Sequence, residues 1–314
     1  MKKLLYTPLF FWIATFLMHC AGGNQARRAY DAKDYRRTLA LCREALSADS
    51  SDVSSMLLMA ESYAALDSFE NARNVLERAA RTGLDETQRV HASNLYFELA
   101  ERTSGNSDVL DCLEKAEALS PRSKDVLERL ARLYEKAGEL EEAYDRYDRL
   151  VMLARDPTEY GFITNSLANK IEFAKEACDK AMQSYRQKQY RDASLYFAKA
   201  VEAYPGMNEA VYYLHLSKVN IIKRNPNKMA RKQARKYLSL ATEARPEKAE
   251  PHFLMARFYE MENDRNLLDE AIYHYSLSLK LEPNGPFAEK SRDKIRRLKK
   301  RKATLDAFWG RTAE

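Results

Sequence analysis

Apolar and polar positions follow a helical period along most of the chain. In residues 124–153, apolar side chains recur at spacings of three and four residues, which places them on one face of a helix. Ala137-Gly138 interrupts this pattern, since glycine costs about 1 kcal/mol relative to alanine in a helix interior. A second apolar stripe then runs from Leu140 to Val151. The pattern predicts two amphipathic helices joined by a tight turn, and helices this short need neighbours to be stable.

The same two-helix pattern recurs along the chain at a spacing close to 34 residues. A small residue stands early in each second helix, an aromatic residue or leucine follows four positions later, and another small residue follows three positions beyond. Ala72, Leu76 and Ala79 are one such set. Small residues allow the helices of one unit to approach closely. We expect five clear units and two looser ones, with additional residues at 158–172 and an enlarged loop at 223–233.

This pattern resembles that of tetratricopeptide-repeat proteins over roughly residues 24–283. The resemblance implies an all-α fold, a right-handed α-solenoid of about six to seven helix pairs with a C-terminal capping helix. It also implies peptide binding, because the first helices of this family line a concave face. We expect two lobes, residues 20–157 and 158–286, followed by a basic amphipathic capping helix over residues 287–314. A superhelix that continues through residues 155–175 is the alternative.

The N-terminus has the features of a targeting segment. MKK precedes the 15-residue apolar run LLYTPLFFWIATFLM, which is typical of a signal peptide and short for a membrane span of about 20 residues. We predict a signal peptide over residues 1–19. Leu17-Met18-His19-Cys20 resembles the lipobox of bacterial lipoproteins, in which the cysteine, here Cys20, is lipidated. His19 departs from that pattern, where a small residue is usual. We therefore predict an exported lipoprotein of the bacterial envelope, facing the periplasm or in the outer membrane. A cleaved secreted protein and a protein with an uncleaved anchor are the alternatives.

Positive charge is concentrated near the C-terminus. The net charge is +6, and residues 289–302 alone contain nine basic and two acidic residues. The simplest interpretation is the solvated face of the capping helix. Contact with an anionic lipid or glycan is the sharper one; protein docking is a third, and nucleic acid is the least favoured partner. The candidate residues for an anionic partner are Arg296, Arg297, Lys299, Lys300, Arg301 and Lys302.

Motifs that carry chemistry are missing from the sequence. We find no nucleotide-binding glycine loop, His-Glu-x-x-His, Gly-x-Ser-x-Gly or Cys-x-x-Cys. The histidines are dispersed, although His215 and His252 approach each other if their helices are neighbours. The four cysteines share no metal-ligand spacing, and Cys42 lies on an apolar stripe, so we expect a core residue there and no disulfide. We therefore predict no enzymatic activity, no cofactor and no metal site.

Peptide-binding positions are inferred from the resemblance. Family members that clamp a peptide C-terminal carboxylate use Lys, Asn and Arg on their first helices. Those positions here hold Ser54, Leu57 and Glu61 in the second unit and Asp125, Glu128 and Arg132 in the fourth. The resemblance therefore implies that this clamp is absent. Later units are more apolar and aromatic at these positions, so the predicted groove residues are Met182, Tyr185, Phe253 and Arg257, with structural packing as the alternative.

The resulting prediction is a non-catalytic scaffold for protein–protein interactions, anchored in the envelope and supporting assembly of a membrane complex. A membrane-tethered receptor that binds anionic lipid or glycan through the basic C-terminal helix is the alternative.

Overall fold

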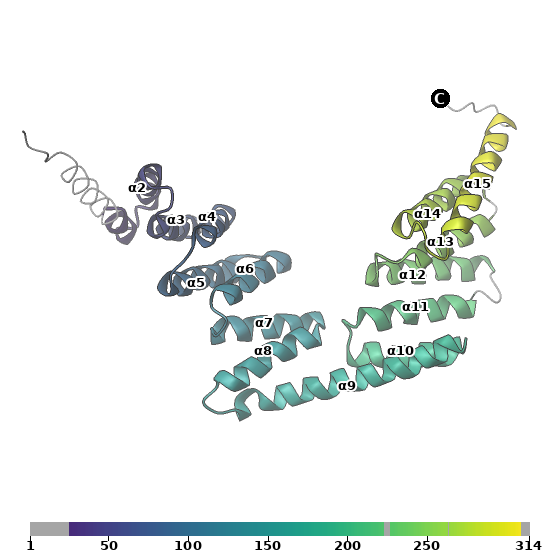
Figure 1. Ribbon diagram of the computed structural model, residues 1–314, viewed down its shortest axis with the longest axis horizontal. Coiled ribbons are helices and arrows are strands. Elements are labelled where there is room, and N and C mark those ends of the chain that lie inside the picture. Colours follow the sequence, from purple (N-terminus) through teal and green to yellow (C-terminus); the bar gives the residue numbers. More distant parts are fainter. Residues whose placement is uncertain (1–24, 223–226, 263, 309–314) are drawn as a thin grey trace, which may run out of the picture. The chain divides into compact units, whose positions relative to one another are not determined.

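The structure is a computed structural model that describes residues 25–222, 227–262 and 264–308 (Figure 1). Within these residues the chain is helical apart from turns, and no strand occurs. Residues 25–31 form a helix, and a short 3-10 turn spans Arg265–Leu267. The other helices are α2 (Tyr35–Ala48), α3 (Val53–Ala65), α4 (Phe69–Thr82), α5 (Glu86–Arg102), α6 (Asn106–Leu119), α7 (Lys124–Ala137), α8 (Leu140–Leu153), α9 (Thr158–Arg186), α10 (Tyr190–Ala203), α11 (Asn208–Ile222), α12 (Lys228–Ala244), α13 (Ala249–Met261), α14 (Leu268–Leu281) and α15 (Ala288–Phe308).

Consecutive helices form pairs, each with a first and a second helix joined by a short turn. The described residues contain seven such pairs, from residues 25–31 with α2 to α13 with α14, and α15 follows them. The small residues of the repeat pattern are buried between helices, as predicted; Ala72, Ala79, Ala193, Ala200 and Ala271 are at most 1% exposed. The all-α array predicted from the sequence is confirmed.

The chain divides into two compact units. The N-terminal unit comprises residues 1–133 and 145–161, and the C-terminal unit comprises residues 134–144 and 162–314. The predicted lobe boundary between residues 157 and 158, and the choice between two lobes and a continuous superhelix, stay predictions.

The additional residues at 158–172 belong to a helix. They are continuous with the first helix of the fifth pair, so α9 is 29 residues long. One face of this extension is buried through Thr164, Leu167 and Ile171, which recur at helical spacing. The extra residues therefore lengthen an existing element and do not form a separate connection.

The enlarged loop predicted at residues 223–233 is shorter in the structure. Helix α12 begins at Lys228, because Asn227 caps it by accepting a 2.8 Å hydrogen bond from the backbone N–H of Ala230 through its side-chain oxygen. The prediction was wrong here because several lysines and arginines were interpreted as loop residues, although both are good helix formers.

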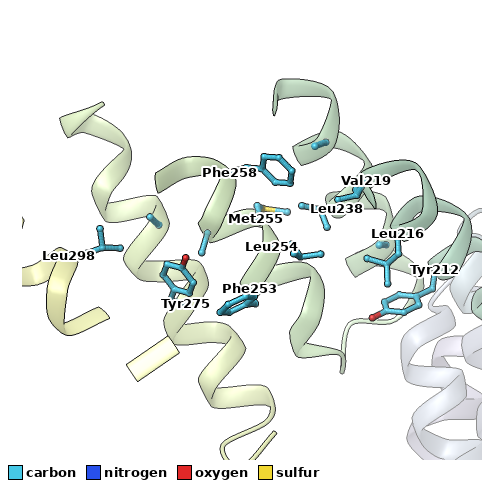
Figure 2. Packing of buried hydrophobic residues seen from close by; sticks show 14 of the residues in the cluster. Tyr212, Leu216, Val219, Leu238, Phe253, Leu254, Met255, Phe258, Tyr275 and Leu298 are labelled. Atoms are coloured by element: carbon cyan, nitrogen blue, oxygen red, sulfur yellow. The ribbon is translucent and has the colours of Figure 1, made fainter. Parts of the chain in front are cut away.

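Aromatic and aliphatic residues together form the interior of the C-terminal unit (Figure 2). Tyr212, Phe253, Phe258 and Tyr275 are each at most 6% exposed and share one core with leucines from α11 to α13. Helix α15 closes this core with Leu298, which is 3% exposed. A polar contact supports the same docking: Glu260 accepts hydrogen bonds from Tyr275 Oη at 3.0 Å and from Lys294 Nζ at 2.7 Å. The predicted capping helix therefore packs on the end of the array.

The predicted signal peptide, residues 1–19, and Cys20 lie outside the described residues. Among the helices that are described, none combines the length and apolar character needed to cross a bilayer.

Candidate functional site

Two cavities open between first helices of the N-terminal unit. The Glu61 cavity measures about 400 Å³ and the Glu128 cavity about 320 Å³. The Glu61 cavity is lined by residues of 25–31, α3 and α5 and by the N-cap residue of α3, namely Arg27, Asp52, Ser54, Ser55, Leu57, Leu58, Glu61, Thr87, Gln88 and His91. The Glu128 cavity, between α5 and α7, is lined by Phe97, Glu101, Asp125, Glu128, Arg129 and Arg132.

A buried carboxylate lies in the wall of the first cavity. The side chain of Glu61 is only 8% exposed. His91 Nε2 lies 2.6 Å from one of its oxygens, and Arg27 Nη1 lies 3.3 Å from the other. A carboxylate is almost never this buried without such partners, because desolvation penalises its charge. Burial and then the negative charge of Glu61 raise the pKa of the neighbouring Tyr30.

Helix caps hold the walls of this cavity in place. Asp52 caps α3 by accepting a hydrogen bond from the backbone N–H of Ser55. Asp85 and Gln88 form a capping box at the start of α5, in which each side chain accepts a hydrogen bond from the backbone N–H of the other residue. These caps fix the first turns of α3 and α5, which carry Ser54, Thr87 and Gln88 in the cavity wall.

The second cavity is bordered by ion pairs. Arg129 Nε lies 2.8 Å from Glu101, and Arg132 donates to Glu128 one turn earlier on the same helix. Asp125 is exposed beside them in the first turn of α7. Such exposed pairs contribute little to stability, typically about 0–1 kcal/mol. Their positions are therefore available to a ligand at low cost to the fold.

Both sets of positions that the family resemblance marked lie at these cavities. Ser54, Leu57 and Glu61 line the first, and Asp125, Glu128 and Arg132 line the second. Their partners Arg27, His91 and Arg129 were not predicted from the sequence. The spacing of 34 residues between Arg27 and Glu61 is one repeat period and was the available signal.

The groove residues predicted in the C-terminal unit lie in or near its interior. Phe253 is 6% exposed and stacks on Phe287 with ring centroids 4.7 Å apart. Tyr185 is partly buried, forms edge contacts with Tyr190 and Tyr213, and accepts a 3.4 Å hydrogen bond from Asn220. Met182 packs against the core of α9 and α10, and Arg257 is partly exposed. Their role in binding a peptide stays a prediction.

The basic residues of α15 differ in their surroundings. Arg296, Arg297, Lys299 and Lys300 are exposed, whereas Arg301 and Lys302 are partly buried. Lys302 Nζ pairs with Asp269 at 2.6 Å, and Arg296 pairs with Asp293 at 2.5 Å. Part of the predicted anionic-partner patch is therefore engaged within the chain.

The histidines form a contact that the sequence did not indicate. His252 lies against His274, with their Nδ1 atoms 3.0 Å apart, and His215 instead stacks on Tyr237. Burial, with a contribution from His252, lowers the pKa of His274 to about 4. No group of three or more potential metal ligands occurs among the residues that the structure describes. Cys42 is fully buried, as predicted, and Cys42, Cys112 and Cys178 are free thiols.

The fold and cavities define a class, an all-α repeat array with cavities between first helices of its N-terminal unit. Residues 29–93 match the family model described as tetratricopeptide repeat. This match covers part of the chain and agrees with the helix-pair array, so the fold is an all-α array of the tetratricopeptide-repeat type. Proteins of this type are typically non-catalytic scaffolds. No curated protein sequence matches the chain.

Solved structures that resemble the chain are also tetratricopeptide-repeat proteins. The P58(IPK) TPR domain is 14% identical over 90% of this chain and 98% of that one, with a TM-score of 0.39. A repeat protein from Parabacteroides merdae is 10% identical over 89% and 98%, with a TM-score of 0.36. The TPR2AB domain of yeast Sti1, in a complex with pHSP90, is 13% identical over 90% and 98%, with a TM-score of 0.32. These likenesses are too distant to add to the fold that the helices define.

Proposed function

We propose that this chain is a non-catalytic scaffold that holds partner proteins through peptide segments bound at the first-helix cavities of its N-terminal unit. The observation that carries the proposal is the Glu61 cavity, which has a volume of about 400 Å³ and both apolar and hydrogen-bonding walls. Leu57 and Leu58 supply apolar surface, whereas Ser54, Thr87 and Gln88 supply polar groups. Sites of this kind bind side chains by burying apolar atoms and orienting them with a few polar contacts.

Site-specific photo-crosslinking tests this proposal. A photoreactive residue at Thr87, in the cavity wall, should form an adduct whose attachment point maps to a short segment of the partner. The same residue at Asn74, exposed on the second helix α4, is the control and should not. Ser54→Trp should abolish the Thr87 adduct by filling the cavity. Adducts at both positions, or adducts that persist with Ser54→Trp, would show that partners bind elsewhere.

The scaffold is further proposed to be an exported lipoprotein of the bacterial envelope, anchored through Cys20 and supporting assembly of a membrane complex. The support is the sequence of residues 1–25, with a basic start, a 15-residue apolar run and a cysteine before small residues. An anchor would confine the scaffold to a surface and raise its effective concentration for partners there. Cys20→Ala should move the protein out of the membrane fraction. Retention of the variant in that fraction would instead favour an uncleaved anchor.

The second candidate function is binding of an anionic lipid or glycan by α15. Four exposed basic residues, Arg296, Arg297, Lys299 and Lys300, favour it. Each basic residue near an anionic membrane is worth about 1 kcal/mol. Replacing Lys299 and Lys300 with Glu should then weaken binding to phosphatidylglycerol vesicles and reduce its salt dependence. Unchanged vesicle binding would leave α15 with its capping role alone.

A further inference from the structure

We propose that the segment bound at the first-helix cavities is basic, and that a Lys or Arg side chain enters the Glu61 cavity. This inference rests on the proposed function. It identifies the chemistry of the partner, a peptide segment with Lys or Arg side chains spaced along it. The expected ligand therefore carries the opposite charge to an acidic C-terminal tail.

The charges that line the two cavities favour a cationic ligand. The linings contain five carboxylates, from Asp52, Glu61, Glu101, Asp125 and Glu128, against three guanidinium groups and one imidazole. Arg27 is shared with a sixth carboxylate, because its Nε lies 3.3 Å from Asp31. Each guanidinium group already pairs with a carboxylate of the same surface. The surface therefore retains a negative excess that attracts cations and repels carboxylates.

Glu61 has acceptor capacity left for such a ligand. A carboxylate offers about four lone-pair positions, and Arg27 and His91 provide one contact to each oxygen. A Lys ammonium or Arg guanidinium in the cavity would donate a charge-assisted hydrogen bond to it. The low exposure of Glu61 strengthens this contact, since buried charges are screened less than surface charges.

The apolar part of the same cavity suits the stem of a basic side chain. Leu57 and Leu58 line it beside Glu61 and are 3% and 8% exposed. Lys and Arg bury their methylene groups along apolar surface while the charged end reaches a polar partner. An incoming Asp or Glu has a shorter stem and would bring its charge toward Asp52 and Glu61.

A fixed-position peptide library, in which one residue is held constant within a degenerate Ser/Ala/Gly background, tests the ligand chemistry. The full chain, purified in mild detergent, should retain peptides with fixed Lys or Arg at least fivefold over those with fixed Asp or Glu. The best basic peptide is then labelled and its Kd measured by fluorescence anisotropy at low and high salt. Its affinity should fall as salt rises.

Matched variants then locate the binding. Glu61→Gln keeps the shape and one acceptor oxygen but removes the charge, and should weaken binding of the basic peptide about tenfold. Asp125→Asn should weaken binding of the basic peptide less than Glu61→Gln does, because Asp125 is exposed. Glu44→Gln removes an equal charge from the exposed surface of α2, a second helix, and should change Kd by less than twofold. Circular dichroism of each variant checks that the fold is intact.

The outcomes separate this inference from the proposed function. If selected peptides are acidic or neutral but Ser54→Trp abolishes their binding, the cavities bind peptides and the inference of a basic ligand is wrong. If Ser54→Trp has no effect on any peptide, or no peptide is retained, the proposed function itself fails. If basic peptides bind but Glu61→Gln matches Glu44→Gln, the attraction is nonspecific and the assignment of Glu61 is overturned.

Discussion

Corresponding positions of the first helices have different roles in the two units. In the N-terminal unit, Leu57 and Glu61 border an open cavity of about 400 Å³. At the corresponding positions of α13, Phe253 is packed in the core and Arg257 is partly exposed. Phe253 lies close to Tyr275 in this core (Figure 2). The ring centroids of Phe253 and Tyr275 are 5.4 Å apart, and those of Phe253 and Phe287 are 4.7 Å apart. Both side chains are buried, since Leu57 is 3% and Phe253 is 6% exposed, but Leu57 lies in the wall of a cavity, whereas Phe253 lies among aromatic rings.

This comparison qualifies a common inference from sequence. Aromatic residues are frequent in binding sites, and they are also the residues that bury the most surface in a core. A repeat position that borders a cavity in one unit can face a neighbouring helix in another. The chemical character of the residue alone therefore does not decide between the two roles.

Among the variants that test this comparison, truncation of Phe253 should have the largest effect on stability. Phe253→Ala should lower the free energy of unfolding by about 3–5 kcal/mol, because it leaves a cavity among buried aromatic residues. Urea denaturation followed by circular dichroism measures this change. Phe173→Ala, at a ring that is 53% exposed on α9, is the matched control and should be nearly neutral. Equal small effects for both variants would contradict the packing role of Phe253.

Most of the fold was predictable, because repeat periodicity encodes it directly. Ala193, Phe197 and Ala200 recur with the spacing of other units and are all fully buried. The extension of α9 was not predictable as helix, since it has no counterpart in the other repeats. The start of α12 depends on the cap that Asn227 provides. In the sequence, Asn227 is one polar residue in a basic stretch, and nothing there indicates that it forms this hydrogen bond.

The candidate site was predictable only in part. The family resemblance identified Ser54, Leu57 and Glu61 as first-helix positions, and they line a cavity. Their sequence did not reveal that Arg27 and His91 meet at Glu61, because these contacts join three separate helices. Long-range ion pairs depend on how units stack, and the repeat pattern fixes the stacking without fixing the side chains that meet.

The second test uses pH, because partly buried histidines occur in the C-terminal unit. Burial lowers the pKa of His274 to about 4 from an ordinary value of 6.5. Unfolding therefore takes up a proton below pH 6.5, so the contribution of His274 is complete above that pH and is lost as the pH falls toward 4. Because the ring is only partly buried, solvent screening limits the loss to about 2 kcal/mol.

Urea midpoints at pH 7 and pH 4.5 measure this dependence. His274→Phe should reduce the difference between the two midpoints, because the phenyl ring keeps the stacking on Tyr259 and carries no proton. Burial also lowers the pKa of His215 to about 4, so His215 should maintain part of the pH dependence of stability in this variant. An identical pH dependence in the variant and the natural chain would exclude His274 as its source.

The third test converts one unit toward the other. Leu57→Phe should place a ring in the Glu61 cavity, as Phe253 does in the core of the C-terminal unit. We expect affinity for the selected basic peptide to fall about tenfold, equivalent to about 1.4 kcal/mol. Leu57→Met, which is close in volume, is the control and should retain binding. Full binding by Leu57→Phe would mean that the ligand does not occupy this cavity.

The smallest effect separates folding from binding at one residue of the Glu61 cavity. Asp52 both caps α3 and contributes a negative charge to the cavity. Asp52→Asn keeps a capping oxygen and removes the charge. It should lower the affinity for the basic peptide two- to threefold, as expected for one surface electrostatic contact, and leave the free energy of unfolding almost unchanged. Asp52→Ala removes the cap as well and should cost about 1 kcal/mol of stability. Anisotropy and urea denaturation on the same preparations distinguish the two effects. If Asp52→Asn destabilises the chain as much as Asp52→Ala does, the charge serves the fold, and the negative excess at this cavity is not an adaptation for ligand binding.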